Sequence, residues 1–378
     1  MIVDLIGFGI VMPVLPFFSK QLGASASVVG FVFAAYSGAQ FLLAPAWGRL
    51  SDRIGRRPVM LMTIAGTALS LLAFGLARSL AWLFAARLLG GAFAANIGVA
   101  SAYIADATAE AERTRWMGLL GASFGVGFVL GPAIGGALAP FGYQVPMLAA
   151  AALAGANWLH AALALREPPH HARSDEAPPG SRFAALRDPV VRRLCFAWLA
   201  FSLAVTQLET NFAFFMMDRF GYDAHQVAFI LVGMAVVMGG IQGGGMRALA
   251  SRFRERALVI AGSLALAGSF VVVPLVHSIA ALIAVLTVSA VSRAIVQPPL
   301  MSMASLAAGA GSRGTVMGTF QSSGSLARAV GPMIAGLLYD RALALPFALG
   351  SALLVSVALL GRALPRGGAP TLAPGEGA

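Results

Sequence analysis

The sequence predicts an all-α membrane protein with twelve transmembrane helices arranged as two pseudo-symmetric six-helix bundles. Of its 378 residues, 58% are hydrophobic and only 11% are charged, whereas soluble domains carry about 25% charge. Such a chain cannot cover itself with polar side chains, so we expect the lipid bilayer to surround it. At roughly 20 residues per span, its length accommodates about twelve helices joined by short loops. An internal repeat indicates that these helices form two related halves.

The repeat joins two stretches that lie about 200 residues apart. Residues 113–138 read RTRWMGLLGASFGVGFVLGPAIGGAL, and residues 313–338 read RGTVMGTFQSSGSLARAVGPMIAGLL. Both contain an aligned Met-Gly pair and an aligned Gly-Pro pair. An earlier basic stretch, residues 48–57, aligns more loosely with residues 247–256. Two related membrane halves around a central site are typical of secondary transporters.

The expected spans divide the chain into four parts. We predict an N-terminal bundle over 1–165, a cytoplasmic linker over 166–193, a C-terminal bundle over 194–361 and a flexible tail over 362–378. The linker is rich in proline and charge, and its second half has the pattern of a short amphipathic helix. The spans are 1–19, 27–48, 59–77, 81–105, 115–138, 144–165, 194–217, 226–246, 257–276, 279–301, 315–338 and 343–361.

The first span is short for a membrane helix. Its 19 residues rise roughly 28 Å, which barely crosses the hydrocarbon core. Either this helix is stunted, or the true start of the chain lies upstream of Met1.

Positive charge alternates between the loops. Most of the 26 lysines and arginines lie in one set of loops, and the positive-inside rule places that set in the cytoplasm. Both termini are then cytoplasmic, which requires an even number of spans. Because the arginines mark loops rather than one patch, the net charge of +11 does not indicate nucleic acid as a partner. The loops on the other side hold only Lys20, Arg78, Arg219 and Arg341.

The sequence does not indicate an enzyme. A membrane enzyme needs clustered histidines or acids on facing spans, but His160, His225 and His277 are dispersed near span ends. We interpret the pair His170-His171 as solvated linker residues, and we expect no metal, cofactor or catalytic residue. No GxxxxGK[ST] motif is present, which argues against ATP-driven pumping. A sensor that does not transport, built on the same scaffold, remains an alternative.

Five segments carry motifs in chain order: DLIGFGIVMPVLPFF (4–18), GRLSDRIGRRPV (48–59), RLLGGAFAANIGVASAYIAD (87–106), GFVLGPAIGG (127–136) and LETNFAFFMMDRFGY (208–222). Together they resemble the major facilitator superfamily, in particular its drug/proton antiporters of the tetracycline-resistance type. The resemblance implies the major facilitator fold in a bacterial inner membrane. It also implies a monomer that exports a small organic compound or drug in exchange for protons.

An importer or metabolite symporter of the same superfamily is the alternative function. The glycine-proline pattern of the fifth span, which is associated with antiporters, argues against it. The tetracycline exporters carry an acid in their ninth span, whereas residues 257–276 hold none. The resemblance therefore does not extend to tetracycline as the substrate.

The resemblance also implies a conformational latch at the turn between the second and third spans. In the family, an acid and a neighbouring arginine here lock the cytoplasmic ends of the two halves. Carried over, Asp52 contacts the start of the eleventh span, and Arg56 pairs with Asp106 at the end of the fourth. We expect the two glycines of the motif to allow a tight turn. The latch residues are Gly48, Asp52, Arg53, Gly55, Arg56 and Asp106.

Two carboxylates lie inside the expected spans, at Asp4 and Glu209. A charge in hydrocarbon costs at least about 2.5–3.5 kcal/mol, and desolvation favours the neutral carboxyl group, which suits a group that binds and releases a proton. Both are therefore proton-coupling candidates, and Arg87 joins them because it matches the family's helix 4 arginine. The structural alternatives are a helix cap for Asp4, a tie between helices for Glu209 and backbone bonds for Arg87.

Glycine-proline segments in the fifth and eleventh spans predict a pliable interface, although close helix packing alone would explain them. These hinge residues are Gly127, Gly131, Pro132, Gly135, Gly331 and Pro332.

A mixture of apolar walls and a few polar groups suits an amphipathic substrate. Each polar residue in the spans could instead be an interhelical hydrogen bond. Because Glu209 can balance only one of Arg293 and Arg328, the second cation favours an anionic substrate. The alternative is that both arginines lie near the cytoplasmic half and extend their charges to the interface. The cavity candidates are Asn96, Phe124, Gln207, Asn211, Gln297, Gln321 and Arg328.

Overall fold

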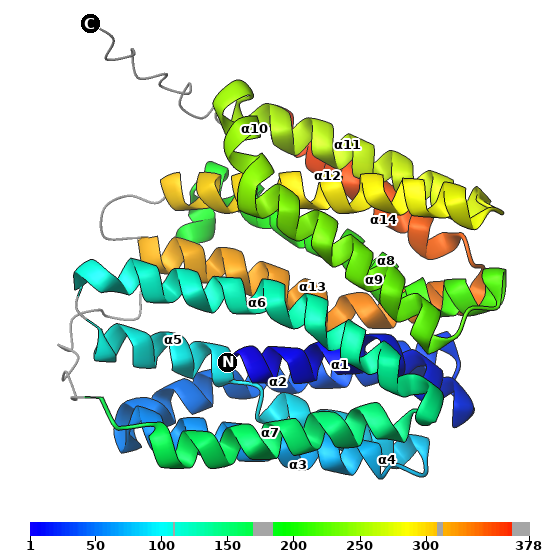
Figure 1. The fold of residues 1–378 in the computed structure, drawn as a ribbon. Coiled ribbons are helices and arrows are strands. Elements are labelled where there is room, and N and C mark those ends of the chain that lie inside the picture. The colour runs from blue at the N-terminus through cyan, green and yellow to red at the C-terminus, as the bar shows by residue number, and fades with distance from the viewer. Residues whose placement is uncertain (109, 169–183, 308–312, 365–378) are drawn as a thin grey trace, which may run out of the picture. The chain divides into compact units, whose positions relative to one another are not determined.

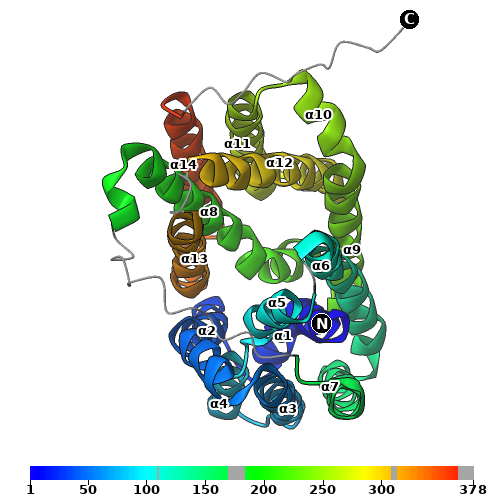
Figure 2. The same ribbon diagram turned by 90° about the vertical axis from the view of Figure 1, so that its left-hand side faces the viewer.

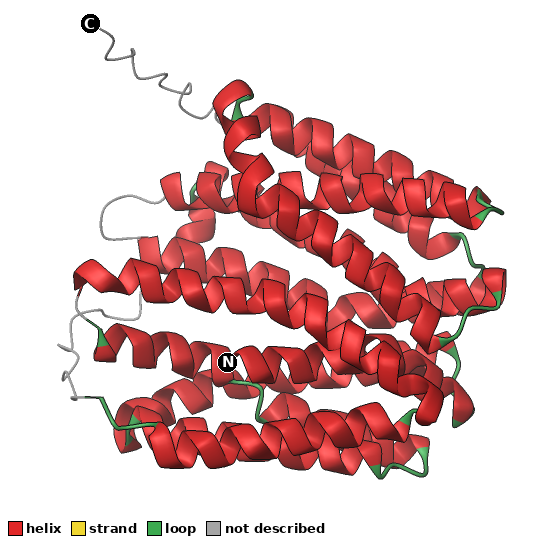
Figure 3. Ribbon diagram, in the orientation of Figure 1, coloured by secondary structure: helices red, strands yellow, loops and turns green. Residues whose placement is uncertain are grey.

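The computed structural model describes residues 1–108, 110–168, 184–307 and 313–364, apart from a few side chains at 110–118, 184–185 and 313–314. Within these ranges the regular structure is entirely helical (Figure 3). An apolar chain must do this because lipid offers its backbone no hydrogen-bond partners. The pair His170-His171 and nearly all of the predicted tail lie outside the described residues.

Within the described ranges, the helices follow one another with short connections (Figure 1). In the first half of the chain they are α1 Ile2–Gln21, α2 Ala26–Ile54, α3 Arg56–Gly75, α4 Leu80–Ala92, α5 Asn96–Ala107, α6 Glu110–Leu138, η1 Ala139–Phe141 and α7 Gln144–Ala164. In the second half they are η2 Ala184–Arg187, α8 Pro189–Phe220, α9 Ala224–Gly240, η3 Ile241–Gly245, α10 Met246–Arg252, α11 Glu255–Val272, η4 Val273–Leu275, α12 Ile279–Leu306, α13 Arg313–Arg341 and α14 Leu345–Arg362.

Eleven helical segments of the described chain are long and apolar enough to cross a membrane. They correspond to all the predicted spans except 315–338. That span lies in α13, which is 29 residues long but rich in serine, threonine and glycine. The chain is therefore a multi-pass membrane protein, and its twelfth span stays a prediction.

Close contacts divide the chain into two compact units. Unit 1 comprises Met1–Glu176, Thr210–Ala235 and Ala329–Ala342, and unit 2 comprises the remaining segments Ala177–Glu209, Val236–Arg328 and Leu343–Ala378. Unit 1 thus contains the first six predicted spans together with end segments of α8, α9 and α13. The division into bundles 1–165 and 194–361 stays a prediction.

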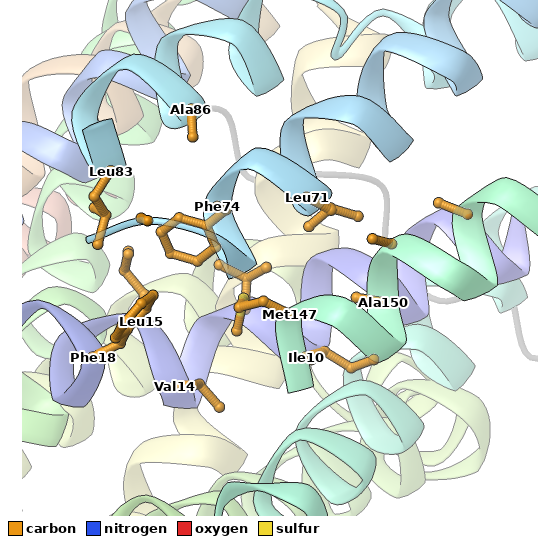
Figure 4. Packing of buried hydrophobic residues seen from close by; sticks show 14 of the residues in the cluster. Ile10, Val14, Leu15, Phe18, Leu71, Phe74, Leu83, Ala86, Met147 and Ala150 are labelled. Carbon is orange, nitrogen blue, oxygen red and sulfur yellow. The ribbon is translucent and has the colours of Figure 1, made fainter. Parts of the chain in front are cut away.

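The core of unit 1 lies where α1, α3, α4 and α7 meet (Figures 2 and 4). Phe18 of α1 meets Phe74 of α3 edge-on at 5.9 Å between ring centroids. Leu83 of α4 and Met147 of α7 are fully buried beside them. These contacts set the direction of α1, which carries Asp4 at its start.

Unit 2 has an aromatic centre of its own. Trp198 of α8 stacks between Phe201 and Phe320, with ring centroids 5.8 and 5.1 Å away. Gly324 of α13 leaves room for the indole, because a Cβ there would collide with Trp198. Phe270 of α11 packs edge-on against Phe347 of α14.

The predicted fourth span is interrupted. Residues 93–95 separate α4 from α5, so the continuous helix expected over 81–105 is wrong at this point. The break leaves backbone carbonyls without helical partners, and α2 supplies donors for two of them. Trp47 donates to the carbonyl of Ala92 at 2.5 Å, and Gln40 donates to that of Ala94 at 2.8 Å. Non-helical backbone is tolerated at membrane depth when protein satisfies it in this way.

Two other boundaries differ from the prediction. The eighth span, expected over 226–246, contains the π-helical segment η3, whose sequence IQGGG is weak in helix propensity. Helix α8 begins at Pro189, inside the predicted linker. Asp188 caps it by accepting hydrogen bonds from the N–H groups of Val190 and Val191, and proline suits the first helical position.

Candidate functional site

The turn between α2 and α3 is tighter than the sequence indicates. Helix α2 continues to Ile54, and the single residue Gly55 turns the chain with φ +104° before α3 begins. Glycine is required there because other residues rarely adopt positive φ. Gly48 was also expected in this turn, which is wrong because it lies inside α2, and a Cβ there would meet nothing within 4 Å.

Arg56 is the centre of a charge cluster at this turn. Its Nε lies 2.8 Å from Asp106 of α5, and its Nη1 lies 2.5 Å from Asp52 of α2. Nη1 also donates to the Ser51 hydroxyl at 2.7 Å. The guanidinium therefore ties three helices of unit 1 together, whereas Arg53 is exposed. The predicted contact between Asp52 and the start of the eleventh span stays a prediction.

Glu167 completes this cluster. Its carboxylate accepts hydrogen bonds from the backbone N–H groups of Arg56 at 2.5 Å and Arg57 at 2.9 Å. A carboxylate at this place satisfies free donors and complements the dipole of α3. In return, the Arg57 side chain donates to the carbonyls of Ala162 and Leu165 at the end of α7. We call Asp52, Arg56, Arg57, Asp106 and Glu167 the inner cluster.

At the opposite ends of these helices, unit 1 joins segments from the two halves of the sequence. Asp340, at the end of α13, accepts hydrogen bonds from the N–H groups of Ala26 and Ser27 at 3.1 and 3.0 Å. The Ser27 hydroxyl donates to the same carboxylate. A side chain more than 310 residues away thus caps the N-terminus of α2, beside the local cap from Ser25.

The ends of α1, α8 and α13 also meet here. Lys20 of α1 pairs with Asp218 of α8 at 3.0 Å, and the Tyr339 hydroxyl donates to the other oxygen of Asp218 at 3.0 Å. The Lys20 ammonium also lies 5.8 Å from the centroid of Phe214. We call Lys20, Ser27, Asp218, Tyr339 and Asp340 the outer network.

Small residues allow backbones to touch beside the outer network. A Cβ on Gly30 of α2 would collide with the Pro332 carbonyl of α13, and one on Gly136 of α6 would collide with Ala228 of α9. These contacts involve α13 and α6, the two helices that contain the aligned Gly-Pro pairs of the internal repeat. The Nδ1 atom of His225 of α9 donates one further hydrogen bond, to the Gly136 carbonyl at 2.9 Å.

The glycines of α6 pack mainly against α1. Cβ atoms built on Gly127, Gly131 and Gly135 would lie 2.5–2.8 Å from atoms of Leu5, Gly9 and Ile10. Their spacing of four residues forms one smooth ridge, as expected when helices associate closely in lipid. The structural alternative of close packing therefore accounts for these glycines, and the hinge role of Gly131-Pro132 and Gly331-Pro332 stays a prediction.

Asp4 lies at the start of α1, half-buried, and accepts a hydrogen bond from Asn157 of α7 at 3.1 Å. Arg87 is buried and lies over the Tyr36 ring at 4.3 Å from its centroid. It forms no ion pair with a carboxylate among the described residues. Its contact is a cation–π interaction with α2, not the backbone bonds to α1 that were the structural alternative.

Glu209 and Arg293 form an ion pair inside the predicted spans of unit 2. The Glu209 Oε1 and Arg293 Nη1 atoms lie 2.6 Å apart, and both side chains are partly exposed. Arg328 of α13 is exposed and donates to the Ser325 hydroxyl at 3.0 Å. Of the two intramembrane cations in this half, Glu209 therefore balances Arg293.

The predicted cavity residues fall in both units. Asn96, Phe124 and Asn211 belong to unit 1, whereas Gln207, Gln297, Gln321 and Arg328 belong to unit 2. Asn211 is buried and donates to the Ala335 carbonyl of α13 at 2.9 Å, and Gln207 is buried and donates to Leu203. The Asn211 bond joins α8 to α13 and is the interhelical hydrogen bond that was the alternative, whereas the Gln207 bond lies within α8. Their role in a cavity stays a prediction.

Sequence reasoning missed several residues of the inner cluster and the outer network. Glu167 was placed in a linker, Lys20 was counted only as a charge beside a span, and Asp218 and Asp340 were not singled out. Their signal was present, because each acid follows an apolar helix closely and Ser25 and Ser27 mark the start of α2. The pairing itself is not visible from local sequence. No group of described side chains could hold a metal ion.

The fold and the site are those of a helical multi-pass membrane transporter for small molecules. The chain belongs to the Major Facilitator Superfamily, whose profile matches residues 1–332.

Similar proteins cover nearly the whole chain. The tetracycline resistance protein, class D, of Salmonella ordonez is 32% identical over 349 residues, which is 90% of this chain and 88% of that protein. Multidrug resistance protein 1 of Bacillus subtilis (strain 168) is 31% identical over 349 residues, with the same coverage. The crystal structure of the human organic anion transporter MFSD10 (TETRAN) matches with a TM-score of 0.69 and 27% identity, covering 95% of this chain and 96% of that one.

Proposed function

We propose that this transporter exports a small organic compound across a bacterial inner membrane in exchange for protons. The observation that carries the proposal is the ion pair between Glu209 and Arg293, because a carboxylate within a span is the group that can take up and release a proton there. The names of the tetracycline and multidrug resistance relatives support the direction of transport. We further propose a monomer with both termini in the cytoplasm, following the alternation of basic loops.

Antiport requires that proton and substrate compete. A proton that neutralises Glu209 ends its attraction to Arg293, and a substrate that binds the Glu209 carboxylate excludes that proton. A cationic or hydrogen-bonding drug fits this scheme. Asp4 is the second candidate for the coupling proton, and Asn157 would hold its carboxyl group in place in either protonation state.

The arginines favour a second candidate function. Protonation of Glu209 would free Arg293, and Arg328 adds a further cation in the same unit. An anion would then bind better together with the proton, which by linkage gives symport and not antiport. The similarity to MFSD10, which is described as a human organic anion transporter, supports this candidate. The charge of the substrate therefore decides the direction of coupling.

Alternating access would use the two charged regions of unit 1. The outer network joins segments of both halves, so we assign it to the state closed to the outside. The inner cluster would steady the state closed to the cytoplasm through the predicted contact of Asp52 with the eleventh span. The outer network would open as the predicted contact of Asp52 with the eleventh span forms, and the other contacts of the inner cluster would persist in both states.

Flux in proteoliposomes tests both candidates. A cationic dye and an organic anion are offered to wild type and to Glu209→Gln, with a pH gradient imposed in each direction. Antiport predicts dye movement against the proton flow, and symport predicts anion movement with it. In both cases Glu209→Gln loses the response to the gradient but retains exchange of substrate. If the response to the pH gradient survives in Glu209→Gln and disappears in Asp4→Asn, the coupling site is Asp4. If wild type transports neither compound, both the export and the symport candidates are contradicted.

Growth of a pump-deficient host on a drug panel tests the latch. Wild type should confer resistance that Asp52→Asn lacks at equal expression. Arg252→Gln, which removes an exposed charge at the end of α10, is the control and should behave as wild type. Resistance to no compound with normal expression would count against drug export.

A further inference from the structure

A groove on unit 2 combines an apolar floor with two cations at one end. It lies between α8 and α14 and has a volume of about 350 Å³. Ser356 is its only uncharged polar side chain, and the hydroxyl is already used in a bond to the Leu353 carbonyl. The remaining lining residues are Arg192, Arg193, Phe196, Leu199, Ala200, Leu203, Leu353 and Leu360.

The groove has the length of one lipid leaflet. Along α8 its lining runs from Arg192 to Leu203, and eleven residues at 1.5 Å each rise about 16 Å. Half of a hydrocarbon core is about 15 Å. The arginines therefore lie at headgroup level when Leu203 lies near the middle of the bilayer. Phe196 is 56% exposed, so the groove opens outward and is not a closed cavity.

The two arginines differ in what they already bind. Arg193 donates from Nη1 to the Ala363 carbonyl at 3.2 Å, which ties α8 to the end of α14 and closes the groove at this level. The side chain of Arg192 is exposed and forms no hydrogen bond or ion pair with the described residues. The nearest acid in the sequence, Asp188, uses its carboxylate to cap α8. Several guanidinium donors at this end of the groove thus remain available.

We propose that this groove binds an anionic phospholipid, with one acyl chain along Leu199, Leu203 and Leu353 and the phosphate on Arg192 and Arg193. In the proposed topology this is the cytoplasmic leaflet, which is the anionic one, and basic pockets between spans on that side suit such headgroups. Arginine matches the geometry of a phosphate with paired donors. The site is separate from the Glu209–Arg293 pair and does not depend on the transported substrate.

Native mass spectrometry of the full chain in detergent tests the site. The chain is titrated with dioleoyl phosphatidylglycerol, dioleoyl phosphatidylcholine and inorganic phosphate. We expect one tightly bound phosphatidylglycerol, weaker phosphatidylcholine and no effect of phosphate on the lipid. Removing one arginine contact costs about 1 kcal/mol, so Arg192→Gln should weaken phosphatidylglycerol about fivefold and the double variant with Arg193→Gln about 25-fold.

Three further variants separate charge, space and folding. Arg192→Lys keeps the charge and should retain most of the binding, whereas Ser356→Phe fills the groove and should weaken both lipids. Arg252→Gln is the matched control, since it removes an exposed arginine of unit 2 outside the groove and should change nothing. Equal affinity for the two lipids, displacement of the lipid by phosphate, or an equal loss in Arg252→Gln would overturn the assignment.

Discussion

The inner cluster and the outer network both hold helix ends together with charge, but they join different parts of the chain. Every contact of the inner cluster lies within the first 167 residues, and Arg56 is buried at its centre. In the outer network, Lys20 and Ser27 bond to Asp218 and Asp340, which are about 200 and 310 residues away. The outer contacts are more exposed. One region therefore builds a rigid turn, and the other is a clasp between the two halves of the sequence.

This difference has a physical basis. Separating the buried Arg56 guanidinium from its two carboxylate partners at the capped start of α3 is costly. Each group left alone would stay desolvated without a compensating partner. Exposed bonds can exchange with water at little cost. In the alternating-access cycle that we propose, the less costly contacts of the outer network are the ones that part, and the more costly contacts of the inner cluster persist.

The largest effect should come from wedging the clasp open. Gly30→Leu places a side chain against the Pro332 carbonyl, and overpacking costs about 1–3 kcal/mol. The population with joined outer ends should fall about 5- to 150-fold. The measurement is the distance between spin labels on Ala24→Cys and Arg341→Cys in a Cys195→Ala background. Gly38→Leu, on the same helix with open space around it, is the control, and an equal shift in both variants would contradict the prediction.

Breaking the inner cluster should lower stability and leave the outer distance unchanged. Arg56→Gln removes the pairs with Asp106 and Asp52, whose partial exposure limits the loss to about 1–2 kcal/mol. Thermal unfolding in detergent measures it as a lower Tm. Arg53→Gln removes an exposed arginine three residues earlier and should leave Tm unchanged. If the two variants unfold alike, Arg56 does not organise this turn.

Removing the cap from α13 should have an intermediate effect. Asp340→Ala deprives the N-terminus of α2 of a carboxylate, and a lost cap costs about 1 kcal/mol. The spin-label distance at the outer end should lengthen in part of the population. Asp223→Ala is the matched control, because Asp223 caps only its own helix α9, and it should lower stability without changing that distance.

The contacts of Asp340 in the clasp should not respond to pH in the working range. Partial burial acts to raise the pKa of Asp340, but the hydrogen bonds from Ser27 and Ala26 outweigh it and leave that pKa below its ordinary value. Asp340 lies beyond the predicted span 315–338. A lowered pKa means that its stabilisation is fully present above about pH 4 and is lost only as pH falls further. The contribution of Asp340 to the outer distance should therefore stay constant between about pH 5 and 8, and a change in that range that Asp340→Ala abolishes would refute this.

The smallest effect should come from the exposed pair of Lys20 and Asp218. A double-mutant cycle with Lys20→Met and Asp218→Asn should give a coupling energy below about 1 kcal/mol, since both side chains are 40% exposed or more. The coupling should shrink further at high salt. A coupling as large as the effect of Gly30→Leu would mean that charge, and not packing, holds the clasp.

Some features of the site were predictable because they depend on short stretches of sequence. The motif around Gly55 located the turn, and the structure places Arg56 beside Asp106 as the family resemblance implied. The interruption of the fourth span was not predictable. Its residues, FAA, are ordinary helix formers, and the break depends on donors from Trp47 and Gln40 about 50 residues earlier.

The positions of charged residues in the sequence also did not show which side chains pair with one another. Glu209 was known to balance only one of two arginines, yet its choice of Arg293 follows from how α8 and α12 are placed. The composition of residues 166–193 predicted that Glu167 lies in a linker. In the structure it follows the end of α7 directly and lies at the start of α3. In both cases the sequence supplied the ionisable group, and packing supplied its partner.

The sequence by itself determined three properties of this protein. It lies in lipid, it is built from helices, and its second half repeats motifs of the first. These properties are sums over many residues, because hydropathy, span length and loop charge accumulate along the chain. Only the tertiary structure decided which helix ends touch, where a span breaks and which arginine meets Glu209. Such pairings depend on single side chains brought together across hundreds of residues, and no local pattern records the distance between them.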